Sequence, residues 1–185
     1  MNGLERYRLT TIGDDTVMNA NPDTHRSDSL VRRITGAEAA QNGSICIWLT
    51  GFSGAGKSTL ANALAQRLHR AERRAYVLDG DHLRLGLNRD LGFSKSDRME
   101  NNRRVAEVAR LMFDAGLIVI VALISPFRVD RHFARSLFPS GAFLEVFVDT
   151  SLEECERRDP ARVKIVAARF MPLPPGYVEL AGWRH

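Results

Sequence analysis

The sequence has few of the features that mark secreted, membrane or metal-binding proteins. Of its 185 residues only two are cysteine, Cys46 and Cys155, and their separation fits no metal-ligand motif. No apolar run is long enough to cross a membrane, and the N-terminus lacks the basic-then-apolar order of a secretion signal. Aromatic residues make up only 8% of the chain and do not interleave with the arginine clusters. We therefore expect a cytoplasmic protein with reduced, buried cysteines, and neither nucleic acid nor a membrane as its partner.

The charge balance leaves room for a small anionic ligand. The formal net charge is +4, which suits a small polyanionic substrate as well as it suits nucleic acid. Most of the arginines are expected on solvated helix faces. The length and the 44% hydrophobic content fit one globular domain with its own core.

The most specific motif is a glycine-rich segment between a strand-like run, 45–49, and a helix-forming run, 60–68. It matches the pattern G-x-x-x-x-G-K-[ST] with Gly51, Phe52, Ser53, Gly54, Ala55, Gly56, Lys57, Ser58 and Thr59. In this context the backbone N–H groups surround phosphates, Lys57 reaches the β- and γ-phosphates, and the Ser58 hydroxyl binds Mg²⁺. The alternative is a chance glycine-rich turn, which the order of strand, loop and helix disfavours. The segment predicts binding of a nucleoside triphosphate, ATP with Mg²⁺.

The apolar patterns after this segment alternate between strand and helix. Strands are expected at 45–50, 75–79, 117–124 and 143–149, and helices at 57–71, 97–115, 128–137 and 151–158. This order predicts an α/β fold of the P-loop NTPase type, with three α/β/α layers and a parallel sheet. Ligands of such sheets bind beyond the carboxyl ends of the strands.

The two ends of the chain break this pattern. Residues 1–28 are polar and weakly periodic, and we expect a flexible arm there. Residues 29–160 form the expected P-loop kinase domain. In the atypical tail, 161–185, Pro172, Pro174 and Pro175 exclude a regular helix or a central strand, so the closing elements of the fold are expected to be missing.

Three further groups of residues lie where strands or loops end. Asp79 and Asp81 flank a glycine after the second strand, where carboxylates could order metal-bound water or accept a proton; a solvated turn is the alternative. Arg84 follows closely enough to hold an anion. Ser125 ends the third strand, where its hydroxyl could contact a substrate or carry a phosphoryl group, or could only cap the next helix.

The next helix also offers candidate ligands. Ser94 or Ser96 can cap it, and Arg98 and Asn101 share one of its faces. Phe93 lies in the loop just before, where an aromatic ring can stack on a base. A capped amphipathic helix beside a buried phenylalanine is the alternative.

Together these motifs resemble the adenylyl-sulfate kinase (APS kinase) family. Members use ATP to phosphorylate the 3′-hydroxyl of adenosine 5′-phosphosulfate (APS), giving PAPS for sulfate assimilation. The resemblance covers about 45–160 and rests on segments 47–51, 78–84, 86–94, 97–101, 114–118, 124–128 and 145–150. The segments Leu91 to Ser94 and Ile124 to Arg128 make the match specific.

The resemblance implies roles for the candidate residues. Asp81 would lie near the metal and the acceptor hydroxyl, and Phe93 would stack on the APS adenine. The phosphosulfate end would be held by Arg84, Arg98 and Asn101. Ser125 matches a serine described in the bacterial family as a phosphoserine intermediate, although in-line transfer needs no covalent step. The expected catalytic residues are thus Lys57, Asp81 and Ser125.

The resemblance also names candidate partners and two departures. ATP sulfurylase and a second copy of the chain, as a homodimer, are the candidate protein partners. Asn102 stands where an aliphatic residue is usual. After Pro160 the family's lid helix and closing strand are not recognisable, which suggests a frameshift or a truncated gene and predicts impaired activity. Two alternatives therefore remain: a small-molecule kinase with another acceptor, and an inactive nucleotide-binding partner of ATP sulfurylase.

Overall fold

The described part of the chain folds around one sheet. The computed structural model describes residues 8–9 and 43–159. The strands are β1 (Arg8–Leu9), β2 (Cys46–Thr50), β3 (Ala75–Asp79), β4 (Ile118–Ala122) and β5 (Phe143–Phe147), and they lie in the order β1-β5-β2-β4-β3. Four of them, β5, β2, β4 and β3, are parallel, whereas β1 pairs with β5 antiparallel. The predicted parallel sheet is confirmed.

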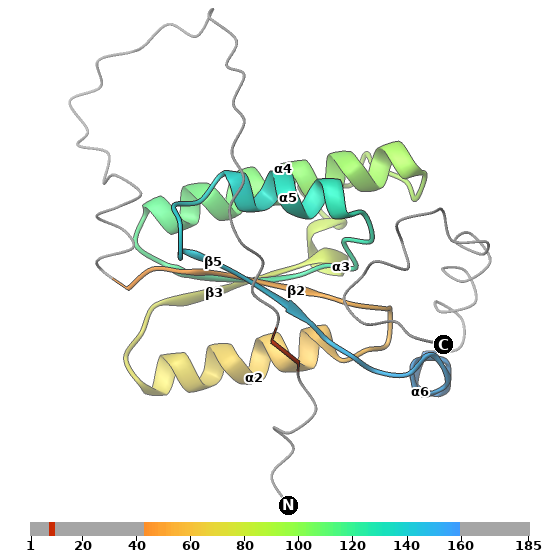
Figure 1. Ribbon diagram of the computed structural model, residues 1–185, viewed down its shortest axis with the longest axis horizontal. Helices are drawn as coiled ribbons and strands as arrows, with labels where there is room; N and C mark the ends of the chain where they lie inside the picture. The colour runs from red at the N-terminus through yellow and green to blue at the C-terminus, as the bar shows by residue number, and fades with distance from the viewer. Residues whose placement is uncertain (1–7, 10–42, 160–185) are drawn as a thin grey trace, which may run out of the picture.

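Helices cover both faces of this sheet. They are α2 (Lys57–Arg70), α3 (Gly80–Leu83), α4 (Lys95–Asp114), α5 (Arg128–Ser136) and α6 (Leu152–Arg158). Figure 1 shows α4 and α5 on one face and α2 on the other, so the predicted three layers are confirmed. Among the helices of the described ranges, none combines the length and the apolar character that a membrane span requires.

Alternation along the strands explains how one sheet serves two cores. In β4 every residue is buried, and successive side chains point to opposite faces. Val119 and Val121 pack with Phe113 of α4, whereas Ile118 and Ile120 pack on the side of α2. This is why β4 has the continuous apolar sequence of a strand that is covered on both sides.

Two details of the helices differ from the sequence expectation. The helix expected from residue 97 begins at Lys95, because Ser94 is its N-cap and forms a reciprocal capping box with Asp97. The single turn of α3 was not predicted. It forms because the Asp79 carboxylate accepts hydrogen bonds from the first backbone N–H groups after β3.

The predicted arm and tail lie largely outside the described residues. Within the arm, residues 1–28, the structure describes only β1 at Arg8–Leu9. The predicted tail at 161–185 lies outside the described residues altogether. The division into three segments, the missing closing elements and the impaired activity therefore stay predictions.

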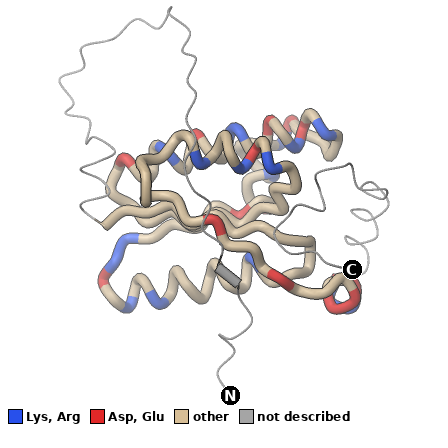
Figure 2. Tube along the Cα trace, in the orientation of Figure 1, with Lys and Arg blue, Asp and Glu red and all other residues tan. Residues whose placement is uncertain are grey.

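The excess of basic residues is spread over the surface. In Figure 2, basic and acidic segments alternate along the helices above the sheet. On α4, for example, the Glu100 carboxylate pairs with both Arg103 and Arg104. Mixed helix faces of this kind agree with the expectation that most arginines are solvated.

Candidate functional site

One cavity of about 1070 Å³ opens at the carboxyl ends of the parallel strands. The loop before α2, the turn of α3, the start of α4, the end of β4 and helix α6 all contribute to its wall. Of the residues predicted to form the site, those that line the cavity are Ser53, Gly54, Ala55, Gly56, Lys57, Ser58, Thr59, Asp81, Arg84, Phe93, Arg98, Asn101 and Ser125. Segments that are far apart in the sequence thus share one cavity.

The glycine-rich loop wraps the N-terminus of α2. Gly54 and Gly56 have φ angles of 77° and 97°, which side chains rarely tolerate. A Cβ on Gly54 would lie 2.8 Å from the carbonyl oxygen of Cys155, so the loop also passes too close to α6 for a larger residue. Gly51 and Phe52, two predicted members of the site, do not line the cavity. These first two residues of the loop contribute through their backbone carbonyls.

Those carbonyls hold the lysine of the loop. The Lys57 ammonium donates to the carbonyl oxygens of Gly51 at 3.0 Å and Phe52 at 2.5 Å. Burial lowers the pKa of Lys57 to about 8, against the opposing charges of nearby acidic groups that include Asp79 and Asp81. The lysine is thus a buried cation at the floor of the cavity, and it is easier to deprotonate than an ordinary lysine.

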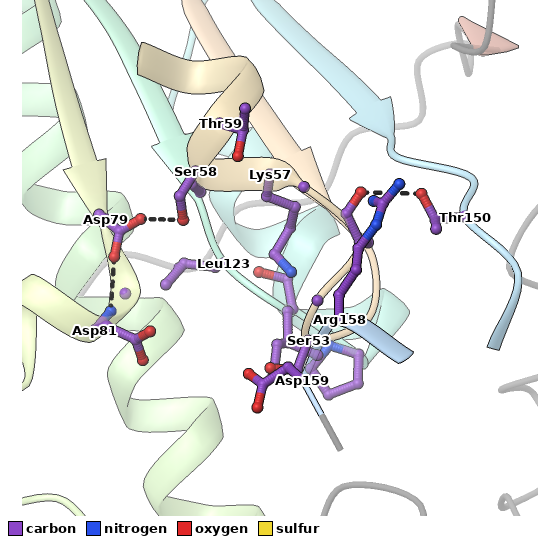
Figure 3. A pocket seen from close by; sticks show the side chains of 18 of the residues that line it. Ser53, Lys57, Ser58, Thr59, Asp79, Asp81, Leu123, Thr150, Arg158 and Asp159 are labelled. Carbon is purple, nitrogen blue, oxygen red and sulfur yellow. Dashed lines mark hydrogen bonds between the residues drawn. The ribbon is translucent and has the colours of Figure 1, made fainter. Parts of the chain in front are cut away.

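A hydroxyl and two carboxylates meet beside this lysine. The Ser58 hydroxyl donates to the Asp79 carboxylate at 2.5 Å, and the other oxygen of Asp79 accepts from the backbone N–H of Asp81 at 3.0 Å. Figure 3 shows Ser58 reaching from α2 towards Asp79 at the end of β3. Oxygen ligands of this kind suit Mg²⁺, which takes one or two protein oxygens and completes its shell with water and phosphate. Within residues 8–9 and 43–159, no three His, Cys, Asp or Glu side chains are grouped so that they could hold a metal ion. A Mg²⁺ site that is completed by water and phosphate does not need such a group.

Another part of the wall presents an aromatic ring close to two guanidinium groups. The guanidinium carbons of Arg84 and Arg98 lie 4.5 and 5.5 Å from the centre of the Phe93 ring. Arg84 also donates to the backbone carbonyls of Leu91 at 3.1 Å and Gly92 at 2.9 Å, and Arg98 donates to that of Phe93 at 3.2 Å. The two arginines therefore shape the loop that carries Phe93, whose ring remains half exposed.

A buried amide, that of Asn88, supports the same part of the wall. Asn88 is fully buried and donates through Nδ2 to Oδ1 of Asn101 at 3.0 Å. This bond uses one of the two lone pairs on the Asn101 oxygen, so the other lone pair and the NH₂ group can serve a ligand in the cavity. The loop between them is further held by a two-pronged ion pair from Arg104 to Asp90, with distances of 2.7 and 2.8 Å.

Ser125 lies where β4 ends, in a strained backbone conformation. Its φ is 41°, which is uncommon for a residue other than glycine. Thr50 donates to the preceding carbonyl, that of Ile124, at 2.7 Å and thereby helps to fix the bend. The Ser125 hydroxyl accepts from Trp48 Nε1 at 3.0 Å and donates to Asn102 Oδ1 at 3.1 Å. It is 2% exposed, so a ligand would reach only one side of it.

Several cavity residues were not among the predicted site residues. They are Asp79, Asn102, Asp149, Thr150, Ser151, Glu154, Arg158 and Asp159, with several apolar residues. Asp79 is a candidate carboxylate beside Asp81 in the sequence, but the resemblance gives a role to Asp81 alone. Helix α6 could not have been placed from the sequence, because its approach to the loop depends on β5 lying next to β2. There Arg158 points at the loop from the far side (Figure 3) while its Nε donates to Glu154 at 2.7 Å.

Comparison with known proteins gives consistent matches. The family described as adenylylsulphate kinase matches residues 43–169. The adenylyl-sulfate kinase of Burkholderia ambifaria is 64% identical over 121 residues, which are 65% of this chain and 67% of that protein. The bifunctional enzyme NodQ of Azospirillum brasilense is 49% identical over 160 residues, which are 85% of this chain but 26% of that enzyme. The chain thus spans about a quarter of the length of this bifunctional relative.

A solved structure extends the match to three dimensions. The APS kinase CysC of Mycobacterium tuberculosis, in complex with AMPPNP and APS, is 45% identical to this chain, with a TM-score of 0.62. The superposition covers 70% of this chain and 76% of that one. Sequence and fold therefore point to the same relatives.

Proposed function

The chain belongs to the adenylylsulphate kinase family, and on that premise we propose that it transfers the γ-phosphoryl group of ATP to the 3′-hydroxyl of adenosine 5′-phosphosulfate. The observation that carries this proposal is the shared cavity. A phosphate-binding loop with a buried lysine forms one side of it, and a half-exposed ring with two guanidinium groups forms the other. A donor triphosphate and an anionic nucleotide acceptor would thus meet in one enclosure.

On the donor side, the chain supplies charge and backbone N–H groups. The loop around Gly54 and Gly56 would surround the phosphates, and Lys57 would leave its two carbonyl partners for the β- and γ-phosphates. Ser58 and Asp79 would hold Mg²⁺, which would neutralise negative charge on the transferring phosphoryl group. Asp81 would lie near the acceptor hydroxyl and accept its proton.

On the acceptor side, the chain supplies a stacking surface and cations. Phe93 would stack on the adenine of APS, and Arg84, Arg98 and Asn101 would hold the phosphosulfate group through charge-assisted hydrogen bonds. The attacking 3′-hydroxyl would then point at the γ-phosphorus for in-line displacement, in which positioning and electrostatics account for most of the rate. Ser125 lies between the two halves and would contact the acceptor.

Product analysis tests the proposal. The purified chain is incubated with ATP, Mg²⁺ and APS, and nucleotides are separated by chromatography; we expect PAPS and ADP in equal amounts. AMP, which lacks the sulfate, and a panel of polyols serve as competing acceptors. Phosphorylation of another acceptor without PAPS would indicate a different small-molecule kinase. Binding of both nucleotides without turnover would indicate a nucleotide-binding partner instead.

The long bifunctional relative bears on the protein's partners. The chain matches 26% of that bifunctional enzyme, so most of the enzyme's polypeptide lies outside the matched region. We propose ATP sulfurylase as a partner of this chain. Co-purification of the two proteins, compared with the chain alone, measures the association.

ATP binding should weaken as the pH rises above about 8. Lys57 has a pKa near 8 because of burial, so it loses its charge progressively through this range, and bound phosphates favour the charged form. Linkage of one proton predicts a fall in affinity that approaches about tenfold per pH unit above the pKa. The terminal phosphate, whose second pKa is about 6, is already ionised there. Calorimetry between pH 7.5 and 9.5 measures the effect, and Lys57→Arg, whose side chain keeps its proton, should show no such slope.

A further inference from the structure

A chain of buried hydrogen bonds leads from the core to the cavity wall at Ser125. Trp48 Nε1 donates to the Ser125 hydroxyl at 3.0 Å, and that hydroxyl donates to Asn102 Oδ1 at 3.1 Å. Asn102 Nδ2 then donates to a carboxylate oxygen of Asp130 at 2.9 Å. All four side chains belong to buried residues, and of the four Ser125 and Asn102 line the cavity.

The donor and the acceptor of every hydrogen bond in this series are determined by its first and last members, Trp48 and Asp130. The indole N–H of Trp48 can only donate, and an ionised Asp130 can only accept. Asn102 must therefore turn its NH₂ group to Asp130 and its oxygen to Ser125, which leaves the serine proton directed at Asn102. Burial raises the pKa of Asp130, whereas the hydrogen bond from Asn102 and the charges of Arg131 and Lys95 favour the carboxylate. The two orientations of the Asn102 amide are hard to distinguish without partners, but here its neighbours favour one of them.

From this geometry we propose that Asn102 is a positioning residue, held in one orientation by Asp130, and that the pair fixes Ser125 as a hydrogen-bond acceptor facing the cavity. The serine proton is directed at Asn102 and one oxygen lone pair is used by Trp48, so one lone pair remains for a ligand. That lone pair suits a hydroxyl donor, such as the acceptor nucleotide of the proposed reaction, on which this inference rests. Asp130 acts at a distance from the cavity, through Asn102.

The same arrangement opposes a phosphoserine intermediate. Such a step would form a bond from Ser125 Oγ to the γ-phosphorus, break the bond to the β,γ-bridging oxygen, and require a base to take the serine proton. The group that receives this proton in its hydrogen bond is the neutral amide oxygen of Asn102, which is no base at physiological pH. We therefore expect direct transfer, with Ser125 orienting the acceptor and never carrying the phosphoryl group.

A double-mutant cycle tests whether Asn102 acts through Ser125. Asn102→Leu removes the proton acceptor and keeps the number and branching of side-chain heavy atoms, and we expect kcat to fall about tenfold while the KM for ATP stays within twofold. In a Ser125→Ala background the same change should have no further effect on kcat, because its target is gone. Asp130→Asn, on α5, should lower kcat in the same direction, and Asp114→Asn, at the C-terminal end of α4, is its control for the loss of a carboxylate. Equal losses from Asn102→Leu in both backgrounds would overturn the proposal, because they would indicate a structural role.

Two further readouts do not depend on APS turnover, so they separate this inference from the proposed function. In ¹⁵N-labelled protein, the indole N–H resonance of Trp48 should move in Asp130→Asn and in Asn102→Leu but not in Asp114→Asn; Trp183→Phe assigns the other indole. If the Trp48 resonance moved in neither Asp130→Asn nor Asn102→Leu, the four side chains would not be linked by the proposed hydrogen bonds. After incubation with ATP and Mg²⁺, mass spectrometry should find Ser125 unmodified. A phosphorylated Ser125 would overturn the assignment as acceptor.

Discussion

Lys57→Ala is expected to reduce phosphotransfer by at least about two to three orders of magnitude, the scale seen when a preorganised group that stabilises transferring charge is removed. The lysine is the buried cation at the floor of the cavity and is held against the loop carbonyls of Gly51 and Phe52. Its loss should also weaken ATP binding by roughly 1.5–3 kcal/mol, the contribution of a charge-assisted hydrogen bond. Steady-state kinetics and calorimetry with ATP and Mg²⁺ give the two numbers.

The control for this variant lies on the same helix. Arg70 ends α2 as Lys57 begins it, and its side chain is exposed and remote from the cavity. Arg70→Ala removes one positive charge and should change neither turnover nor ATP affinity. If Lys57→Ala bound ATP as tightly as the unchanged protein, the loop would not be the phosphate site.

Arg98→Ala should raise the requirement for APS by about ten- to a hundredfold and leave ATP binding nearly unchanged. Arg98 is buried at the start of α4, with its guanidinium above the Phe93 ring and its Nε on the Phe93 carbonyl. Removing it takes away a charge-assisted contact, worth roughly 1.5–3 kcal/mol, and one support of the stacking ring. Measuring the KM for APS at saturating ATP and the KM for ATP at saturating APS separates the effect on the acceptor from the effect on the donor.

Arg103 provides the matched arginine on the same helix. It is exposed and pairs with Glu100, outside the residues that line the cavity. Arg103→Ala should alter neither KM by more than about twofold, since exposed ion pairs contribute little. Equal damage to ATP and APS use in Arg98→Ala would mean that this arginine supports the fold and does not select the acceptor.

Local patterns in the sequence predicted most of the fold. The continuous apolar run of β4 indicated a strand covered on both faces, and its residues are all buried. The glycine-rich segment was readable because its spacing, the strand before it and the helix after it are all local features. Residues such as Phe93 and Arg98 could be placed together because they are close in the sequence and join one loop to one helix.

What the sequence could not predict depends on contacts between distant residues. Asn102 stood out only as a polar residue at a position where an aliphatic one is usual. Its partners, Ser125 and Asp130, are 23 and 28 positions away, and they meet it only because α4 and α5 pack on the same face of the sheet. The amide pair of Asn88 and Asn101 is a similar case, because no periodicity indicates which of two buried amides supports the other.

The carbonyl oxygens that hold Lys57 also set a threshold for the anions that can enter. An arriving ligand must replace two close contacts that the ammonium makes with carbonyl oxygens of its own loop. A single weakly held anion gains little by that exchange, whereas a triphosphate chain brings several negative oxygens to the loop at once. We therefore expect this loop to favour a triphosphate over a single simple anion.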